Sequence, residues 1–139
     1  MMRQTENWPD LPLGNELART LARLHGELPL SVSQALQLLC AALNEGHVCL
    51  DLGAVAGTRI GDVSLPKRDK WLAALASHPA IGAPGQFKPL TLDAAGRLYL
   101  TRYWLYEQQL AKRLLALAAA PPQAVDAGQL RQMLQALFA

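Results

Sequence analysis

Two cysteines, three histidines and eleven acidic residues are the side chains of this sequence that could form a catalytic site. Cys49 and His47 lie two residues apart, so they would share one face of a strand and could form a thiolate–imidazole pair. Such a pair also needs a third group that orients the histidine and donors that stabilise an oxyanion, and the sequence indicates neither. We therefore interpret His47 as a residue that bonds backbone groups at a strand entrance, and we predict no catalytic residue in this chain.

Metal and nucleotide sites are not predicted either. A zinc site needs several cysteine and histidine ligands at short spacing. Cys40 and Cys49 could both approach His47, but a fourth ligand is missing, and the acidic residues are scattered. The glycines of residues 53–61 recur every four residues, but no Gly-Lys-Ser/Thr sequence follows them, as a phosphate-binding loop would require. We predict no metal ligand and no cofactor-binding residue in this part of the protein.

The densest group of residues suited to recognition is Arg102, Tyr103, Trp104 and Tyr106. On a helix, Tyr103 and Trp104 point about 100° apart and Tyr106 returns toward Tyr103, so at least one of the three rings faces outward. Packing of these rings against the preceding segment, contact with a protein and stacking on single-stranded bases remain open. The sparse positive charge favours the first two, and we predict these four residues as candidates for partner contact.

The composition indicates a folded chain that is poor in charge. Hydrophobic residues make up 51% and charged residues 17%, with a net charge of +2. That is too apolar for a disordered chain, and it fits either an Ala/Leu-rich helical core or a surface that a partner covers. The mild basicity argues against a dedicated nucleic-acid binder with a dense basic face. The polar N-terminus has no signal sequence and no apolar run is long enough for a membrane span, so we predict a cytoplasmic protein with no membrane contact.

The elements that would position these residues are mostly helices. We predict a mainly α (α+β) fold with about five helices and a small antiparallel sheet. The first helix ends near Pro29, and the second is capped by Ser31 or Ser33 and ends at Gly46. The third begins at Pro66 and stops before Pro79. The fourth covers residues 102–119 after a Thr101 cap, and the fifth is capped by Asp126.

The predicted sheet combines one strand with a hairpin. Residues 47–52 form a short run rich in β-formers between two glycines. Residues 89–93 and 97–101 alternate apolar and polar side chains around a three-residue connection that ends in Gly96, which indicates a hairpin with a glycine at positive φ. Residues 53–63 and 78–89 are predicted as loops because they are rich in glycine and proline.

The predicted domain organisation is simple. Residues 1–14 form a flexible N-terminal arm, and residues 15–139 form a single helical accessory domain. The last amphipathic helix stops at Phe138 without a capping glycine, so we expect the domain to be cut before further domains of a longer protein.

Two blocks of the sequence carry a resemblance to a known family. Residues 45–52, Glu-Gly-His-Val-Cys-Leu-Asp-Leu, resemble the EGHVCLPL-like strand of the RecD family. Residues 97–107, Arg-Leu-Tyr-Leu-Thr-Arg-Tyr-Trp-Leu-Tyr-Glu, resemble its RLYL-x-R-x-W-x-x-E segment. The blocks occur in the family's order, and Asp51 stands where the family often has proline.

This resemblance implies a function that composition and periodicity do not reach. It implies that the parent protein is an ATP-dependent 5′→3′ DNA helicase, the RecD-like subunit of exodeoxyribonuclease V in double-strand break repair. It also implies a non-catalytic N-terminal assembly domain that docks the motor to a RecC-like subunit, in a complex with a RecB-like subunit. ATP and Mg would then bind only in the motor domains, and DNA would be bound by the parent complex and not clearly by this domain. The alternative is a small winged-helix-like DNA-binding module, which the order of helix, strand and hairpin and the basic pI would fit.

Overall fold

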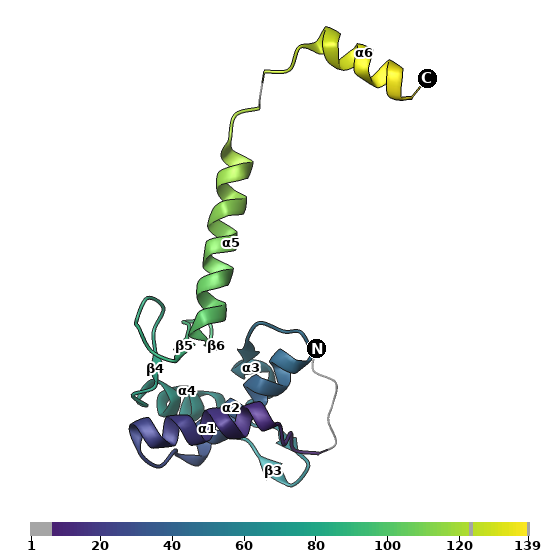
Figure 1. Ribbon diagram of the computed structural model, residues 1–139. Coiled ribbons are helices and arrows are strands. Elements are labelled where there is room, and N and C mark those ends of the chain that lie inside the picture. The colour runs from purple at the N-terminus through teal and green to yellow at the C-terminus, as the bar shows by residue number, and fades with distance from the viewer. Residues whose placement is uncertain (1–6, 123, 139) are drawn as a thin grey trace. The chain divides into compact units, whose positions relative to one another are not determined.

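The structure is a computed structural model that describes residues 7–122 and 124–138 (Figure 1). The chain divides into two compact units, the first ending at Gln108 and the second beginning at Gln109. The described residues contain six helices and small sheets, which confirms the predicted mainly helical α+β class. The unit boundary falls inside the region that the sequence predicts as one domain, residues 15–139.

Helices α1 (Pro12–His25) and α2 (Leu30–Asn44) pack against each other in the first unit. Proline suits the first turn of a helix because its missing N–H would have no partner there, so α1 begins at Pro12. The predicted arm of residues 1–14 is therefore wrong at its C-terminal end, and residues 1–6 lie outside the described residues. Helix α2 begins directly after the extended Pro29, so the predicted caps Ser31 and Ser33 lie inside the helix instead.

A four-stranded sheet lies beside these helices, with strand order β1-β6-β5-β4. Its strands are β1 (Leu50–Asp51), β4 (Ile81–Gly82), β5 (Leu90–Leu92) and β6 (Arg97–Leu100). Strands β1 and β5 pair with β6 in antiparallel fashion, as predicted, and β4 adds a parallel pair at the edge.

The first strand is shorter than the predicted 47–52. The side chain of Asp51 accepts a 2.9 Å hydrogen bond from the N–H of Gly53 and caps the short helix α3 (Leu52–Val55). A residue that caps a helix ends the strand before it. His47 and Cys49 consequently lie outside the strand.

The predicted hairpin between β5 and β6 is confirmed, with Gly96 at φ +85°. The Asp93 carboxylate holds the turn by accepting hydrogen bonds from the backbone N–H groups of Ala95 and Arg97 and from the Arg97 guanidinium. Burial alone would raise the pKa of Asp93, but these hydrogen bonds outweigh it and lower the pKa below its ordinary value. The turn is thus fixed both by glycine and by a charged acceptor.

Two segments predicted as loops contain strands. The region 53–63 and the residue after it include the hairpin of β2 (Arg59–Ile60) and β3 (Val63–Ser64), and residues 78–89 include β4. Helix α4 (Arg68–Ala76) begins two residues after Pro66, with Lys67 as the N-terminal flanking residue. A strand of two residues is too short to show alternating apolar and polar side chains in the sequence. These strands form because of the segments that they pair with.

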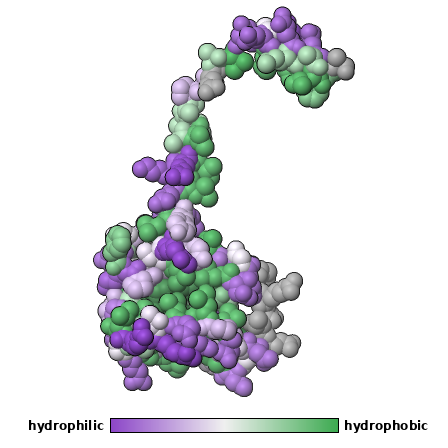
Figure 2. All heavy atoms as spheres, viewed as in Figure 1, coloured by the Kyte–Doolittle hydropathy of each residue, from purple (hydrophilic) through white to green (hydrophobic). Residues whose placement is uncertain are grey.

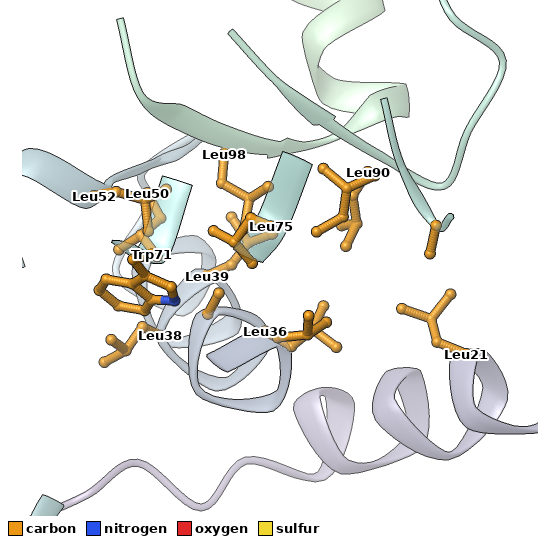
Figure 3. Packing of buried hydrophobic residues seen from close by; sticks show 14 of the residues in the cluster. Leu21, Leu36, Leu38, Leu39, Leu50, Leu52, Trp71, Leu75, Leu90 and Leu98 are labelled. Carbon is orange, nitrogen blue, oxygen red and sulfur yellow. The ribbon is translucent and has the colours of Figure 1, made fainter. Parts of the chain in front are cut away.

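The core of the first unit lies between helices α2 and α4 and the sheet (Figure 3). Trp71 of α4 is fully buried, and its indole N–H donates a 2.8 Å hydrogen bond to the carbonyl of Ser31 in α2. Leucines from the two helices meet leucines from the sheet, namely Leu36, Leu39, Leu75, Leu90 and Leu98. The first unit therefore has a complete hydrophobic core of its own.

The second unit contains the C-terminal part of α5 (Thr101–Ala119) and helix α6 (Ala127–Leu137). The Asp126 side chain accepts hydrogen bonds from the N–H groups of Gly128 and Gln129, which confirms the predicted cap. Strand β6 ends at Leu100 and α5 begins at Thr101, so the strand runs directly into the helix without a loop. The Thr101 hydroxyl lies 2.7 Å from that of Thr91. Every described side chain from Gln109 to Phe138 is exposed.

Candidate partner-binding surfaces

Three of the four predicted contact residues come together at the start of α5. The Arg102 guanidinium lies 5.2 Å from the centre of the Tyr103 ring, a cation–π contact. The rings of Tyr103 and Tyr106 meet edge to face at 6.3 Å, and Tyr106 is exposed. Trp104 is half-buried and, by helical spacing, points about 160° away from Tyr106, so it does not share this surface.

Tyr99 and Glu107 hold this end of α5 to the sheet. Tyr99 is buried in β6, and its hydroxyl donates a 3.4 Å hydrogen bond to the Glu107 carboxylate. Burial, followed by the neighbouring Cys49 thiol, raises the pKa of Tyr99 above its ordinary value, so the hydroxyl keeps its proton and donates it in this hydrogen bond.

The structure does not bring Cys49 and His47 together as a nucleophilic pair. The Cys49 thiol lies beside the Tyr99 hydroxyl, and burial raises its pKa, which opposes formation of a thiolate. The His47 imidazole lies 3.8 Å from the Glu45 carboxylate. Its backbone N–H bonds to the carbonyl of Ala42, so the residue is anchored at the end of α2 and not at a strand entrance.

Phe87 is a surface residue that the sequence reading missed. It lies in the loop between β4 and β5 and is 104% exposed, more than any other large hydrophobic side chain among the described residues. The loop was read only as a Pro/Gly-rich connection. A lone aromatic residue among turn formers was the available signal, because such a ring has no element to pack it.

Two apolar stripes lie on the second unit. Leu110, Leu114 and Leu117 form the α5 stripe, and Leu130, Leu134 and Leu137 form the α6 stripe. The spacing of four and then three residues is the same in both, so each set lies on one helix face. Their exposed fractions lie between 46% and 76%, and Figure 2 shows hydrophobic atoms along one side of each helix and hydrophilic atoms along the other.

A histidine pair lies where α1 meets the end of α4. The rings of His25 and His78 are 6.0 Å apart in an edge-to-face arrangement, and His78 is buried. The Nδ1 atom of His78 accepts a hydrogen bond from the N–H of Ala80, which requires the neutral ring. Burial, then the charges of His25 and Lys88, lowers the pKa of His78 below its ordinary value of 6.5.

This lowered pKa predicts that acid destabilises the first unit. The folded state holds His78 neutral at pH values where the unfolded state already binds a proton. The stabilisation from neutral His78 is therefore complete above pH 6.5 and is lost as the pH falls from 6.5 through the folded pKa. Urea unfolding between pH 8 and pH 5 should show a falling free energy of unfolding, and His78→Gln should flatten that fall. A fall of the same size in the variant would assign the effect to other groups.

Comparisons with known proteins identify the family of this chain. A family model described as "RecBCD enzyme subunit RecD, N-terminal domain" matches residues 11–99. The chain belongs to the RecD family. It is 42% identical over 112 residues to "RecBCD enzyme subunit RecD" of Mycolicibacterium smegmatis, which covers 80% of this chain and 20% of that protein. It is 36% identical over 104 residues to the protein of the same name from Mycobacterium tuberculosis (strain CDC 1551), covering 73% and 17% of the two chains.

The RecD assignment confirms the family resemblance, and the matched range contains residues 45–52 and the first three residues of the second block, 97–107. The chain spans about a fifth of the length of the curated relatives that it matches. The matched range ends at Tyr99, so it includes the core of the first unit and stops before α5. Among the described residues, no helix is both long enough and apolar enough to cross a membrane.

Proposed function

We propose that this chain is the non-catalytic N-terminal assembly domain of a RecD-like subunit and that it docks that subunit's motor onto a RecC-like subunit. In this proposal the parent is an ATP-dependent 5′→3′ DNA helicase, and its ATP and Mg sites lie in the four-fifths of the protein that this chain does not span. The relatives are named RecBCD enzyme subunit RecD, which describes them as subunits of a larger enzyme.

The α5 and α6 stripes are the observation that carries this proposal. The first unit buries ten leucines in its core cluster, whereas the six leucines of the two stripes in the second unit are exposed. Each stripe spans about 10 Å along its helix and would fit a hydrophobic groove of a partner protein. Burying one leucine fully contributes about 1.5–3 kcal/mol, so the two stripes offer enough apolar surface for a stable assembly.

The winged-helix alternative has weaker support. In that reading the helix before the hairpin, α4, would enter a DNA groove. Helix α4 has nine residues and buries Trp71 and Leu75, and its Arg68 guanidinium donates a hydrogen bond to the carbonyl of Ala95 in the hairpin turn. The residues of α4 thus serve mainly to hold the hairpin and the core.

The test is co-expression of the 139-residue chain with a RecC-like subunit and, separately, with a RecB-like subunit. We expect the RecC-like subunit to co-purify with the tagged chain through gel filtration and the RecB-like subunit to do so only when the RecC-like subunit is present. A folded chain that captures neither subunit would overturn the proposal. Direct capture of the RecB-like subunit alone would show that the proposed docking partner is wrong.

A further inference from the structure

The second unit carries the whole net charge of the chain. Residues 1–108 contain ten basic and ten acidic residues, whereas residues 109–139 contain three basic residues and one acid. The acid is Asp126, which caps α6. The three basic residues are Lys112, Arg113 and Arg131. All three are exposed, and none of them forms an ion pair with another described residue, so the second unit offers its cations to a partner.

An arginine borders each of the two apolar stripes. Successive residues of a helix point about 100° apart, so Arg113, three residues after Leu110, lies about 60° from it at one border of the α5 stripe. Arg131, three residues before Leu134, lies about 60° from it at a border of the α6 stripe. Lys112 lies about 160° from Leu110, on the far side of α5. A partner that covers the stripes would therefore meet the two arginines and not the lysine.

A second copy of this chain does not match the charge of these borders. Residues 109–119 and helix α6 contain no acidic residue. If two copies paired through their stripes, Arg113 and Arg131 would each meet an uncharged residue or another arginine. Like charges that face each other across an interface oppose association. The surface that matches the stripes is therefore one that brings carboxylates of its own.

A protein groove also matches better than a lipid surface. Helices that lie on membranes carry Lys and Arg across a broad polar face. On α5 within the second unit, Lys112 is the only charged residue on the side away from the stripe, and Leu115 is exposed near it. The border opposite Arg113 carries only small side chains, those of Ala111 and Ala118. The charge thus lies on one border of the α5 stripe, which suits a partner with carboxylates on one side of an apolar groove.

We propose, on the basis of the docking function proposed above, that the surface which receives the α5 and α6 stripes is an apolar protein groove with carboxylates placed opposite Arg113 and Arg131. The leucines supply the buried apolar area. The two guanidinium groups donate charge-assisted hydrogen bonds to the carboxylates, and each guanidinium can bond both oxygens of one carboxylate. These bonds orient the helices in the groove, because a helix turned about its axis would lose them.

The test is calorimetric titration of the 139-residue chain with the RecC-like subunit in about 50 and about 500 mM NaCl, between which the screening length falls from about 14 to about 4 Å. Arg113→Gln should weaken the complex about fivefold at the lower salt concentration and less than about twofold at the higher one, because salt screens charge pairs at the edge of an interface. Arg113→Gln combined with Arg131→Gln should weaken it about 25-fold at the lower concentration, since the two sites act independently.

Lys112→Gln is the matched control. It removes the same charge from the neighbouring residue of the same helix, but on the side away from the stripe. The affinity should therefore stay within about 1.5-fold of that of the unmodified chain at both salt concentrations. Arg113→Lys, which keeps the charge, should recover most of the affinity that Arg113→Gln loses. Since the three basic residues are exposed, all these variants should keep the circular dichroism spectrum of the folded chain.

The outcomes separate this inference from the docking function. Equal losses from Arg113→Gln and Lys112→Gln, or a loss from Arg113→Gln that is unchanged at the higher salt concentration, would overturn the inference and leave docking intact. Absence of a complex at both salt concentrations would overturn docking and the inference with it.

Two measurements on the chain alone test the other occupants. A dimer in sedimentation equilibrium that Leu110→Glu with Leu114→Glu converts to a monomer would assign the stripes to a second copy. Co-sedimentation with vesicles of phosphatidylcholine and phosphatidylserine that the same double variant abolishes would assign them to a lipid surface. Either result would overturn the inference, and we expect a monomer that does not bind the vesicles.

Discussion

Replacing Trp71 with alanine should lower the free energy of unfolding by about 3–5 kcal/mol, which is a large part of the stability of a small domain. The indole is fully buried between α4 and α2, and it donates its N–H to the carbonyl of Ser31. The truncation opens a cavity in the leucine-rich core and also removes the hydrogen bond. Guanidinium unfolding followed by far-UV circular dichroism measures the loss.

Trp71→Phe separates the two contributions. It keeps most of the ring volume and loses the indole N–H, so it should cost about 1–2 kcal/mol for the hydrogen bond and a smaller cavity. A cost below about 1 kcal/mol for Trp71→Ala would mean that the core does not depend on the contact between α4 and α2.

Placing two glutamates on the α5 stripe, as Leu110→Glu with Leu114→Glu, should weaken the complex with the RecC-like subunit at least a hundredfold. Each change removes an apolar contact of about 1.5–3 kcal/mol and adds a charge whose burial has a high free-energy cost. Both leucines are exposed in the isolated chain, so its free energy of unfolding should stay within about 0.5 kcal/mol. Isothermal titration calorimetry of the unmodified and double-variant chains with the partner gives the two affinities.

The matched control carries the same two charges on the opposite face of α5. Gln108 and Ala116 are exposed and point about 160° and 240° around the helix from Leu110, so Gln108→Glu with Ala116→Glu should leave the affinity within about threefold. Equal losses in the two double variants would show that negative charge, not the apolar stripe, controls docking.

The sequence was most informative where a residue type imposes local geometry. Gly96 at positive φ and the alternating strands fixed the hairpin, and Asp126 fixed the start of α6. The sequence was least informative where a contact between distant residues decides the local structure. Strand β4 exists because Ile81 pairs with Leu90, and residues around it read as a loop. Pro12 was placed in a flexible arm, although the helix that it begins packs against α2.

The candidate surfaces were predictable only in part. Helical spacing indicated that Tyr103 and Tyr106 share a face, and the structure agrees. It gave no indication that Trp104 is half-buried, because burial depends on what lies beside the helix. The exposure of Phe87 was not predicted because a loop has no period from which to infer a face.

The direct passage from β6 into α5 has a mechanical consequence. Strand β6 is an inner strand with β1 on one side and β5 on the other, and no loop separates Leu100 from Thr101. A tension applied to the start of α5 would therefore reach the hydrogen bonds of β6 to both neighbours, with no loop between the helix and the strand to extend first. A pulling load on α5 would thus be borne by the sheet and by the core that the sheet covers.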